Sequence, residues 1–238
     1  MKFAVDLHIH SVLSPCSDSD MTPNNIVNMA LLKGLDFIAI TDHNSAENLK
    51  AVCKCAEGTG LIVVPGMEIE TSEEIHLVCL FPDVGRALQM QSNIYASLPL
   101  ISNREDIYGS QLVMDEYDTV TGDIKQLLLT ASHLNTDEIF RLVGNAGGIA
   151  IPAHIDRQAF SMLSNLGSIP EHLGIRHLEL SKSCSEAGFR AEHPELAEYR
   201  LLRSSDAHTL GDILEREMFF ELEERSVECL LRKLGGNI

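Results

Sequence analysis

Residues 3–11 have the sequence Phe3-Ala4-Val5-Asp6-Leu7-His8-Ile9-His10-Ser11. The apolar start, followed by strict alternation of polar and apolar residues, predicts a β-strand in which residues two apart point to the same side. Asp6, His8 and His10 are therefore expected on one face. Two imidazoles with a carboxylate nearby suit a divalent transition metal. On its own, this stretch leaves open the alternative of a strand with two solvent-facing histidines.

A carboxylate and an imidazole two residues apart return near the other end of the chain. Asp206 and His208 follow the apolar pair Leu201-Leu202, which is typical of a strand end. The first and last strands of a closed barrel are neighbours, so the two pairs would meet. Between them, further acids and histidines each lie at or just beyond a short apolar run: Asp42, His43, Glu68, His76 and His154. This regular placement indicates one shared site.

Size and composition favour a single domain. The 238 residues, 45% of them apolar, are enough for one barrel with a small insertion, and we expect one domain over residues 1–238. Nothing at the amino terminus resembles a signal peptide, and no apolar stretch approaches the roughly 18 residues of a membrane span. We therefore expect a cytoplasmic protein without a membrane partner. The six cysteines lack the paired spacing of a zinc knuckle.

The charge balance bears on the substrate. A formal net charge of −17, without any basic run, disfavours a protein that holds long nucleic acid through phosphate contacts. Bound divalent cations would create one local positive pocket on an acidic body. A small phosphorylated substrate can enter such a pocket, whereas a polymer would be repelled elsewhere on the surface.

Strands and helices are expected to alternate along the chain. Strands are expected over residues 35–40, 61–64, 75–81, 149–152, 175–180, 201–204 and 217–222. Helices are expected over residues 23–33, 46–58, 137–145, 158–166, 194–199 and 227–234. This order predicts an α/β fold with parallel strands joined by helices and with its chemistry at the carboxyl ends of the strands. The pattern weakens over residues 82–136, which we expect to form an inserted lid or cap segment.

In order and spacing, the polar motifs resemble those of the polymerase and histidinol phosphatase (PHP) domain family. The resemblance runs from residue 3 to about residue 210. It is carried by Asp6-Leu7-His8-Ile9-His10-Ser11, Thr41-Asp42-His43, Gly66-Met67-Glu68, His76, Pro152-Ala153-His154 and Ser205-Asp206-Ala207-His208. It implies a distorted (β/α)7, TIM-like barrel with a site of up to three divalent metals that acts on phosphoesters.

The resemblance also implies which residues hold the metals. His8, His10, Glu68 and Asp206 would hold one ion, with Glu68 bridging to a second. The remaining family ligands are matched by His43, His76, His154 and His208. We therefore expect two to three ions of zinc, manganese or iron. Asp6 and Asp42 are expected to orient neighbouring histidines, because a metal-bound imidazole usually donates its other N–H to a carboxylate or carbonyl.

The sequence departs from the family pattern at one position. The family usually has an acid five residues after the second histidine, but Pro15 stands there. Asp18 is our expected replacement ligand, because the pattern requires a hard carboxylate. Cys16 is the alternative, and its thiolate would favour zinc. A loop that supplies no ligand, with a site of two metals, is the third possibility.

Two cations and one histidine are candidates for contact with substrate. Arg157 lies three residues past His154, and Lys182 follows a later strand. A guanidinium or ammonium there would clamp phosphate oxygens, although a solvated surface charge is an equal alternative for each. His133 lies in the expected insertion, where a hydrogen-bonded surface histidine is favoured over a substrate contact. The remaining histidines are interpreted as structural: His172, His177 and His193.

We expect an enzyme that hydrolyses a phosphomonoester of a small metabolite or nucleotide by attack of a metal-bridging hydroxide. His208 or His43 would assist the leaving group. The resemblance favours nucleotide- and oligonucleotide-processing members over a histidinol-phosphatase-like enzyme, which stays an alternative. A non-catalytic metal-binding regulatory module is another, because fold does not fix function. An amidohydrolase ranks last, since Glu68 stands where those enzymes often have a lysine. The oligomeric state stays open.

Overall fold

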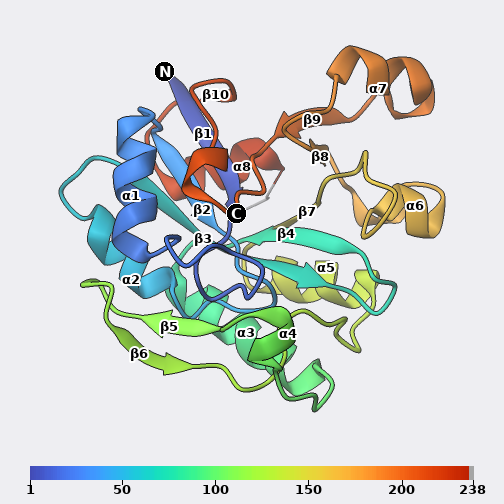
Figure 1. Ribbon diagram of the computed structural model, residues 1–238. Helices are drawn as coiled ribbons and strands as arrows, with labels where there is room; N and C mark the ends of the chain where they lie inside the picture. Colours follow the sequence, from blue (N-terminus) through green and yellow to red (C-terminus); the bar gives the residue numbers. More distant parts are fainter. Residues whose placement is uncertain (236–238) are drawn as a thin grey trace.

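The computed structural model describes residues 1–235, which are built around a six-stranded mixed sheet (Figure 1). Its strand order is β10-β1-β2-β3-β4-β7. β1, β2 and β3 are parallel, while β10, β4 and β7 join antiparallel. The strands are β1 (Lys2–Ile9), β2 (Phe37–Ile40), β3 (Ile62–Glu70), β4 (His76–Leu80), β7 (Ile149–Pro152) and β10 (Phe219–Glu221).

The sheet curls towards a barrel but does not close. β8 (His177–Leu180) and β9 (Arg200–Arg203) form a separate parallel pair. After β9 the chain returns to the first strand, where the His10 N–H donates to the Ala207 carbonyl at 3.0 Å. Within residues 1–235 no strand ladder joins β7 to β8. The expected α/β class and the meeting of the two chain ends are therefore confirmed, but the described residues form an open half-barrel instead of a closed ring of seven parallel strands.

The short link between β3 and β4 explains the mixed sheet. Only five residues, 71–75, separate these strands. A parallel connection needs a crossover of a dozen or more residues. A link of this length can therefore only form a hairpin. The hairpin reverses the chain, and Glu70 is paired directly with His76. The expected ligand His76 is thereby brought close to the end of β3, where Glu68 also lies.

A bulge in β1 changes the face that each polar residue occupies. The register with β2 shifts between Asp6 and Ile9. Ala4 and Ile9, five positions apart, pack in the same apolar cluster, which strict alternation forbids. His8 and His10 point together, with their Nε2 atoms 3.1 Å apart. The prediction that Asp6 shares their face is wrong, because the extra residue re-aims the end of the strand.

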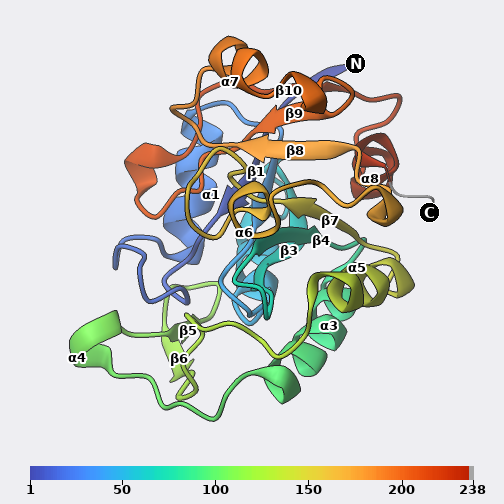
Figure 2. The same ribbon diagram turned by 90° about the vertical axis from the view of Figure 1, so that its right-hand side faces the viewer.

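The helices cover both sides of the sheet. The described helices are α1 (Pro23–Leu32), α2 (Leu49–Ala56), α3 (Val84–Ser97), α4 (Glu105–Tyr108), α5 (Thr136–Asn145), α6 (Met162–Leu166), α7 (Glu186–Glu192) and α8 (Val227–Leu234), with 3₁₀ turns at Glu171–Leu173, Pro194–Leu196 and Leu210–Asp212. Apolar residues of α1, α2, α3 and α5 share one cluster, while α8 packs in a second. Figure 2 shows α3 and α5 side by side. None of the helices within residues 1–235 has the length and hydropathy to span a membrane.

Local signals predict helix starts well where a cap is present. Thr22 caps α1 by accepting from the Asn25 N–H, and Pro23 is the first helical residue, as expected. α5 begins one residue early because Asn135 is its cap, in a reciprocal pair with Glu138. α3 was not expected within the weak pattern of residues 82–136. It is capped by Asp83 and buries Ala87, Met90 and Ile94.

The segment after α3 lies against the loop that follows β1. It contains α4 and a hairpin of β5 (Leu112–Met114) and β6 (Val120–Asp123), along the lower edge of Figure 1. Gly109 has φ +97° and ψ 170°, a region essentially restricted to glycine. A Cβ built there would lie 2.2 Å from the carbonyl oxygen of Pro15. Gly109 therefore permits close contact between this segment and the loop.

We expect Gly109→Ala to lower the free energy of unfolding by about 1–3 kcal/mol, because the new methyl group is both strained and in collision with backbone. Urea denaturation measures the change. Gly122→Ala is the matched control, since a Cβ there meets nothing within 4 Å. Equal stabilities of the two variants would contradict the proposed contact.

Candidate metal centre

Glu68 is the centre of a buried cluster of imidazoles. Its side chain is 1% exposed. Nitrogen atoms of five histidines lie within 3.4 Å of its two carboxylate oxygens. They are His43 Nδ1 and His76 Nδ1 at 2.9 Å, His8 Nε2 and His154 Nε2 at 3.3 Å, and His10 Nε2 at 3.4 Å. Burial raises the pKa of the Glu68 carboxyl, but His76, His8 and His43 hold it well below its usual range.

Three overlapping groups have ligand atoms that all lie within 4.8 Å of one another. The groups are His8-His10-Glu68-Asp206, His43-Glu68-His76 and His10-His43-His208. Glu68 belongs to the first two, as expected for a bridging carboxylate. His154 is outside these groups but keeps its contact with Glu68. The structure therefore brings together eight of the nine expected ligands, from segments at the ends of β1, β2, β3, β7 and β9 and the start of β4.

The hydrogen-bond network leaves unshared electron pairs facing one another. His10 Nδ1 bonds to Ser14 Oγ at 2.9 Å, and that hydroxyl donates to Asp42 Oδ1 at 2.8 Å, so the imidazole must donate. His8 Nδ1 donates to Glu179 at 2.9 Å. Both Nε2 atoms then face each other at 3.1 Å, close to Asp206 Oδ1. Such an arrangement requires a cation, and the imidazole and carboxylate donors fit a divalent transition metal.

Protons take the cation's place when no metal is bound. Burial disfavours charge on His8, but Glu179, Glu68 and Asp206 raise its pKa well above the usual range. Burial, together with His208 and His43, lowers the pKa of His10 well below that range. One imidazole therefore holds a proton that its neighbour lacks. A metal must displace that proton, so its binding becomes stronger as pH rises.

Strained backbone surrounds the cluster. Four non-glycine residues there have φ in the left-handed region: Asn44 (+52°), His154 (+29°), Phe160 (+57°) and Asp206 (+51°). Such residues persist only where the surroundings hold them, and they concentrate at functional sites. Asn44 is held by its own side chain, which accepts from the Glu70 N–H and donates to the carbonyls of Leu128 and Thr130.

The cluster forms the floor of a cavity of about 370 Å³. Arg157 lies in its lining, with Nη2 2.7 Å from Asp206 Oδ2 and a side chain that is 46% exposed. The lining comprises Cys16, His43, Glu68, Glu70, His76, Leu129, His154, Arg157, Phe160, Asp206 and His208.

Residues 6–167 match the model of the PHP domain. The chain belongs to the PHP domain family. Similar proteins include an uncharacterized protein of Methanocaldococcus jannaschii, which is 36% identical over an alignment of 98 positions that covers 37% of this chain and 57% of that protein. A phosphoribosyl 1,2-cyclic phosphate 1,2-diphosphodiesterase of Eggerthella lenta is 31% identical over an alignment that covers 34% of this chain and 31% of that protein. A 5'-3' exoribonuclease of Haemophilus influenzae is 32% identical over an alignment that covers 32% of this chain and 27% of that protein.

These alignments span between 27% and 57% of the relatives' lengths. Solved structures share the fold over nearly the whole chain. A lesion-specific endonuclease from Pyrococcus furiosus has a TM-score of 0.70 at 21% identity, over 98% of this chain and 56% of that one. A Bifidobacterium adolescentis protein described as a metal-dependent phosphoesterase has a TM-score of 0.62 at 18% identity, and the superposition covers 96% of each chain. The expected PHP family membership is confirmed.

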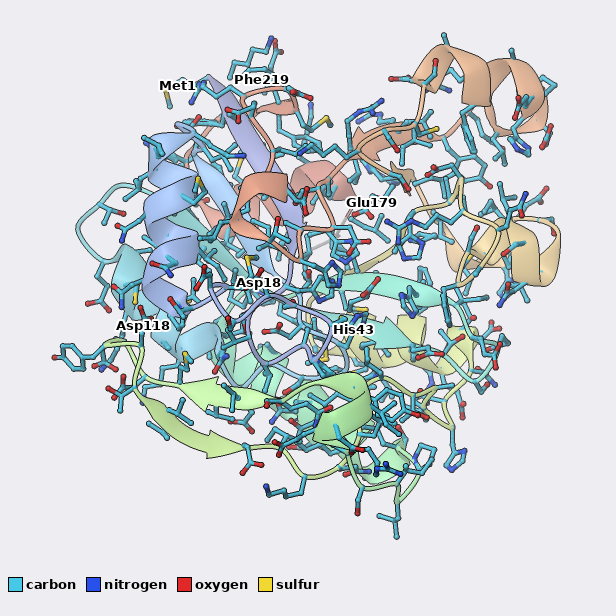
Figure 3. All side chains as sticks on the ribbon, viewed as in Figure 1. Met1, Asp18, His43, Asp118, Glu179 and Phe219 are labelled. Carbon is cyan, nitrogen blue, oxygen red and sulfur yellow. The ribbon has the colours of Figure 1, made fainter. Side chains whose placement is uncertain are left out.

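Two expected site residues keep their side chains outside the cluster around Glu68, although the Asp18 backbone N–H donates to the His208 carbonyl at 2.8 Å. Asp18 is exposed, and its carboxylate accepts from Ser19 and from the Asp20 N–H. Figure 3 labels it apart from His43 and Glu179. Lys182 is also exposed and donates to the Asp212 carbonyl at 2.7 Å. Neither residue lines the cavity.

Cys16, the alternative to Asp18, does line the cavity. Desolvation raises the pKa of its thiol, but hydrogen bonds with His208 and His43, and the charges of those imidazoles, lower it to about 6. Thiolates are the form of cysteine that binds metals. The structure thus brings the thiol, and not the Asp18 carboxylate, to the histidines.

Glu179 was missed by the sequence analysis, and Asp42 and Asp6 act on other partners than the neighbouring histidines expected for them. Glu179 on β8 binds His8, although 171 positions separate the two residues. Its only local signal is a charge inside the apolar strand His177-Leu178-Glu179-Leu180. Asp42 acts on His10 through Ser14, and not on its neighbour His43. Asp6 accepts from the backbone of Ser205 and Leu214, so it fixes the loop that carries Asp206.

We expect Glu179→Gln to weaken metal binding by about 10- to 100-fold, because an amide orients and polarises the His8 imidazole less than a carboxylate does. Competition with a chromophoric chelator measures the affinity. Glu195→Gln, which alters an exposed partner of His193, should leave it unchanged. An unaltered affinity in the Glu179 variant would show that other contacts hold His8.

In metal-free protein, we expect iodoacetamide to alkylate Cys16 with a pH midpoint near 6, because the rate follows the thiolate fraction. Burial raises the pKa of Cys53 to about 11, so that thiol should stay unreactive. Mass spectrometry locates the label, and Cys16→Ser should remove it. A midpoint near the ordinary thiol value of about 8.5 would contradict the hydrogen bonds with His43 and His208.

Proposed function

We propose that this protein is a metal-dependent hydrolase of phosphoesters, and that its substrate is a phosphomonoester of a small metabolite or nucleotide. The observation that carries this proposal is the buried group of imidazoles around Glu68, at the floor of a cavity that also presents Arg157. PHP membership and the names of the relatives, which include a diphosphodiesterase and exoribonucleases, support phosphoester hydrolysis in general.

Two to three ions of zinc, manganese or iron would be held by the three ligand groups around Glu68, His10 and His43. When bound, such ions neutralise charge on phosphoryl oxygens and make water more acidic. Cys16 is proposed as the additional ligand of the group that contains His43 and His208, in place of Asp18.

The chain's own residues would position the phosphate and supply protons. Arg157 has a planar fork of donors, of which only Nη2 is engaged by Asp206, so it can also hold phosphate oxygens. In a site of two ions, in which His208 binds no metal, His208 would be the better candidate for donating a proton to the leaving group, since its side chain is 28% exposed and that of His43 is 10% exposed. Burial lowers the pKa of His208, but the adjacent Cys16 raises it overall. Lys182 is left out of this assignment.

Charge and cavity size favour a small substrate. Arg157 is the only lysine or arginine among the described cavity-lining residues, and the chain carries a net charge of −17. Contacts along a nucleic acid backbone need several cations. A second candidate is hydrolysis of a phosphodiester at the end of an oligonucleotide. It is favoured by the relatives that are named as a diphosphodiesterase and exoribonucleases.

The test is hydrolysis by metal-loaded protein of a panel that contains nucleoside monophosphates, sugar phosphates, histidinol phosphate, an aryl phosphodiester and short oligonucleotides. We expect monoester turnover that a chelator or His10→Ala abolishes, because either change removes the metal. His133→Ala, in an exposed residue outside the cavity lining, is the matched control. Diester turnover alone would support the second candidate. No turnover at all by fully loaded protein would favour a non-catalytic module.

A further inference from the structure

One corner of the cavity differs from the rest of its lining. Most lining residues are histidines or charged residues, but Leu129 and Phe160 form an apolar wall. Leu129 comes from the chain between β6 and α5, within the segment expected to act as a lid, and Phe160 comes from the loop after β7. Two loops far apart in sequence therefore place apolar side chains beside a metal centre.

Phe160 is presented in a conformation that costs energy. Its φ of +57° is uncommon for a bulky residue, for which glycine is the usual choice. The His76 N–H holds the loop by donating to the Phe160 carbonyl at 3.0 Å. The Phe160 ring stacks on the His76 imidazole with centroids 4.6 Å apart, yet the residue is 42% exposed. The ring thus supports a ligand histidine and keeps free surface towards the cavity.

Glu70 supplies a polar group in the same corner. The residue is 9% exposed, and it lines the cavity. Within residues 1–235 its closest charged partner is His76 Nε2 at 3.9 Å, which is too long for a hydrogen bond. Its carboxylate oxygens are not enclosed by protein, so donors of a molecule in the cavity can reach them. Glu70 can therefore accept from N–H groups at the edge of a bound ring.

We propose that Phe160, Leu129 and Glu70 form the leaving-group subsite, and that it takes a flat heterocycle with N–H donors, such as the base of a nucleotide. This inference rests on the proposed phosphoesterase function and names its substrate class. The phosphate would lie at Glu68 and Arg157. The Phe160 ring lies against the face of the His76 imidazole, whereas Glu68 meets the same imidazole at its Nδ1 edge. The stacking surface is therefore offset from Glu68, and a spacer such as a sugar would connect the phosphate to the stacked ring.

The size of the cavity is compatible with this occupant. About 370 Å³ falls within the range of small-molecule sites. Stacking on an aromatic side chain tolerates any base, because every base has a π-face. Selection among bases would then come from the Glu70 carboxylate, which favours rings that carry an exocyclic amine.

The experiment compares kcat/KM for adenosine 5'-monophosphate with that for ribose 5-phosphate, which lacks the base. We expect the ratio to be well above one and to fall about tenfold in Phe160→Leu, the size of effect typical for loss of a stacked base. Phe160→Tyr should restore it. Leu129→Ala should lower it through a different loop, and Phe140→Leu, outside this cavity, should not. Glu70→Gln should reduce the preference for adenosine over uridine monophosphate.

The outcomes separate this inference from the proposed function. Hydrolysis of no monoester in the whole panel would overturn the proposed function and this inference with it. Hydrolysis of other monoesters, but of no nucleoside monophosphate, would overturn the subsite alone. Equal hydrolysis of both, or an equal loss of both in Phe160→Leu together with reduced metal content, would keep the phosphoesterase and overturn the subsite. In that case Phe160 serves only to support His76.

Discussion

The buried charge of Glu68 is the constraint on which the rest of the structure depends. An ionised carboxylate removed from water is costly unless opposite charge or hydrogen bonds compensate. Here five imidazoles from separate segments supply that compensation, within 3.4 Å. Those imidazoles need a cation in turn, because the Nε2 atoms of His8 and His10 face each other. The fold is therefore arranged so that metal ions or protons complete it.

Residues behind the ligands hold this arrangement in place. Glu179 fixes His8, and Asp42 fixes His10 through Ser14. Asp6, on the opposite face of β1, holds the loop that carries Asp206 and His208. Asp42 and Asp6 accept hydrogen bonds at both carboxylate oxygens, whereas Glu179 accepts from His8 and from the His154 N–H at Oε1 alone. The positive φ angles of the loops after β2, β7 and β9 are tolerated because the surrounding contacts determine the backbone.

Local features of this chain could be predicted from sequence, and long-range ones could not. The His8–His10 pair, the Thr22 cap of α1 and helix α8 depend on short spacings that a pattern reveals. The predicted face of Asp6 is wrong because a single extra residue in β1 reverses the alternation of side chains. The prediction of parallel strands fails at β4, because the turn over residues 71–75 is too short for a crossover, and the described residues do not close the expected barrel. Glu179 is a site residue only through folding, which brings β8 to β1.

The net charge of the chain is negative, whereas metal ions would make the charge at the site positive. The local charge at the site determines which ligands can bind there. A net charge of −17 describes the whole surface, whereas the cavity presents Arg157 and a group of ligands that gains positive charge with each ion. An anion is thus attracted only where the metals are. In the proposed function that local charge would fix the phosphate, so selectivity would arise from the other groups that line the cavity. In the subsite proposed here those groups are Leu129 and Phe160 from two loops and Glu70 at the end of β3, so the surroundings of the metal centre, and not the centre itself, would determine the substrate.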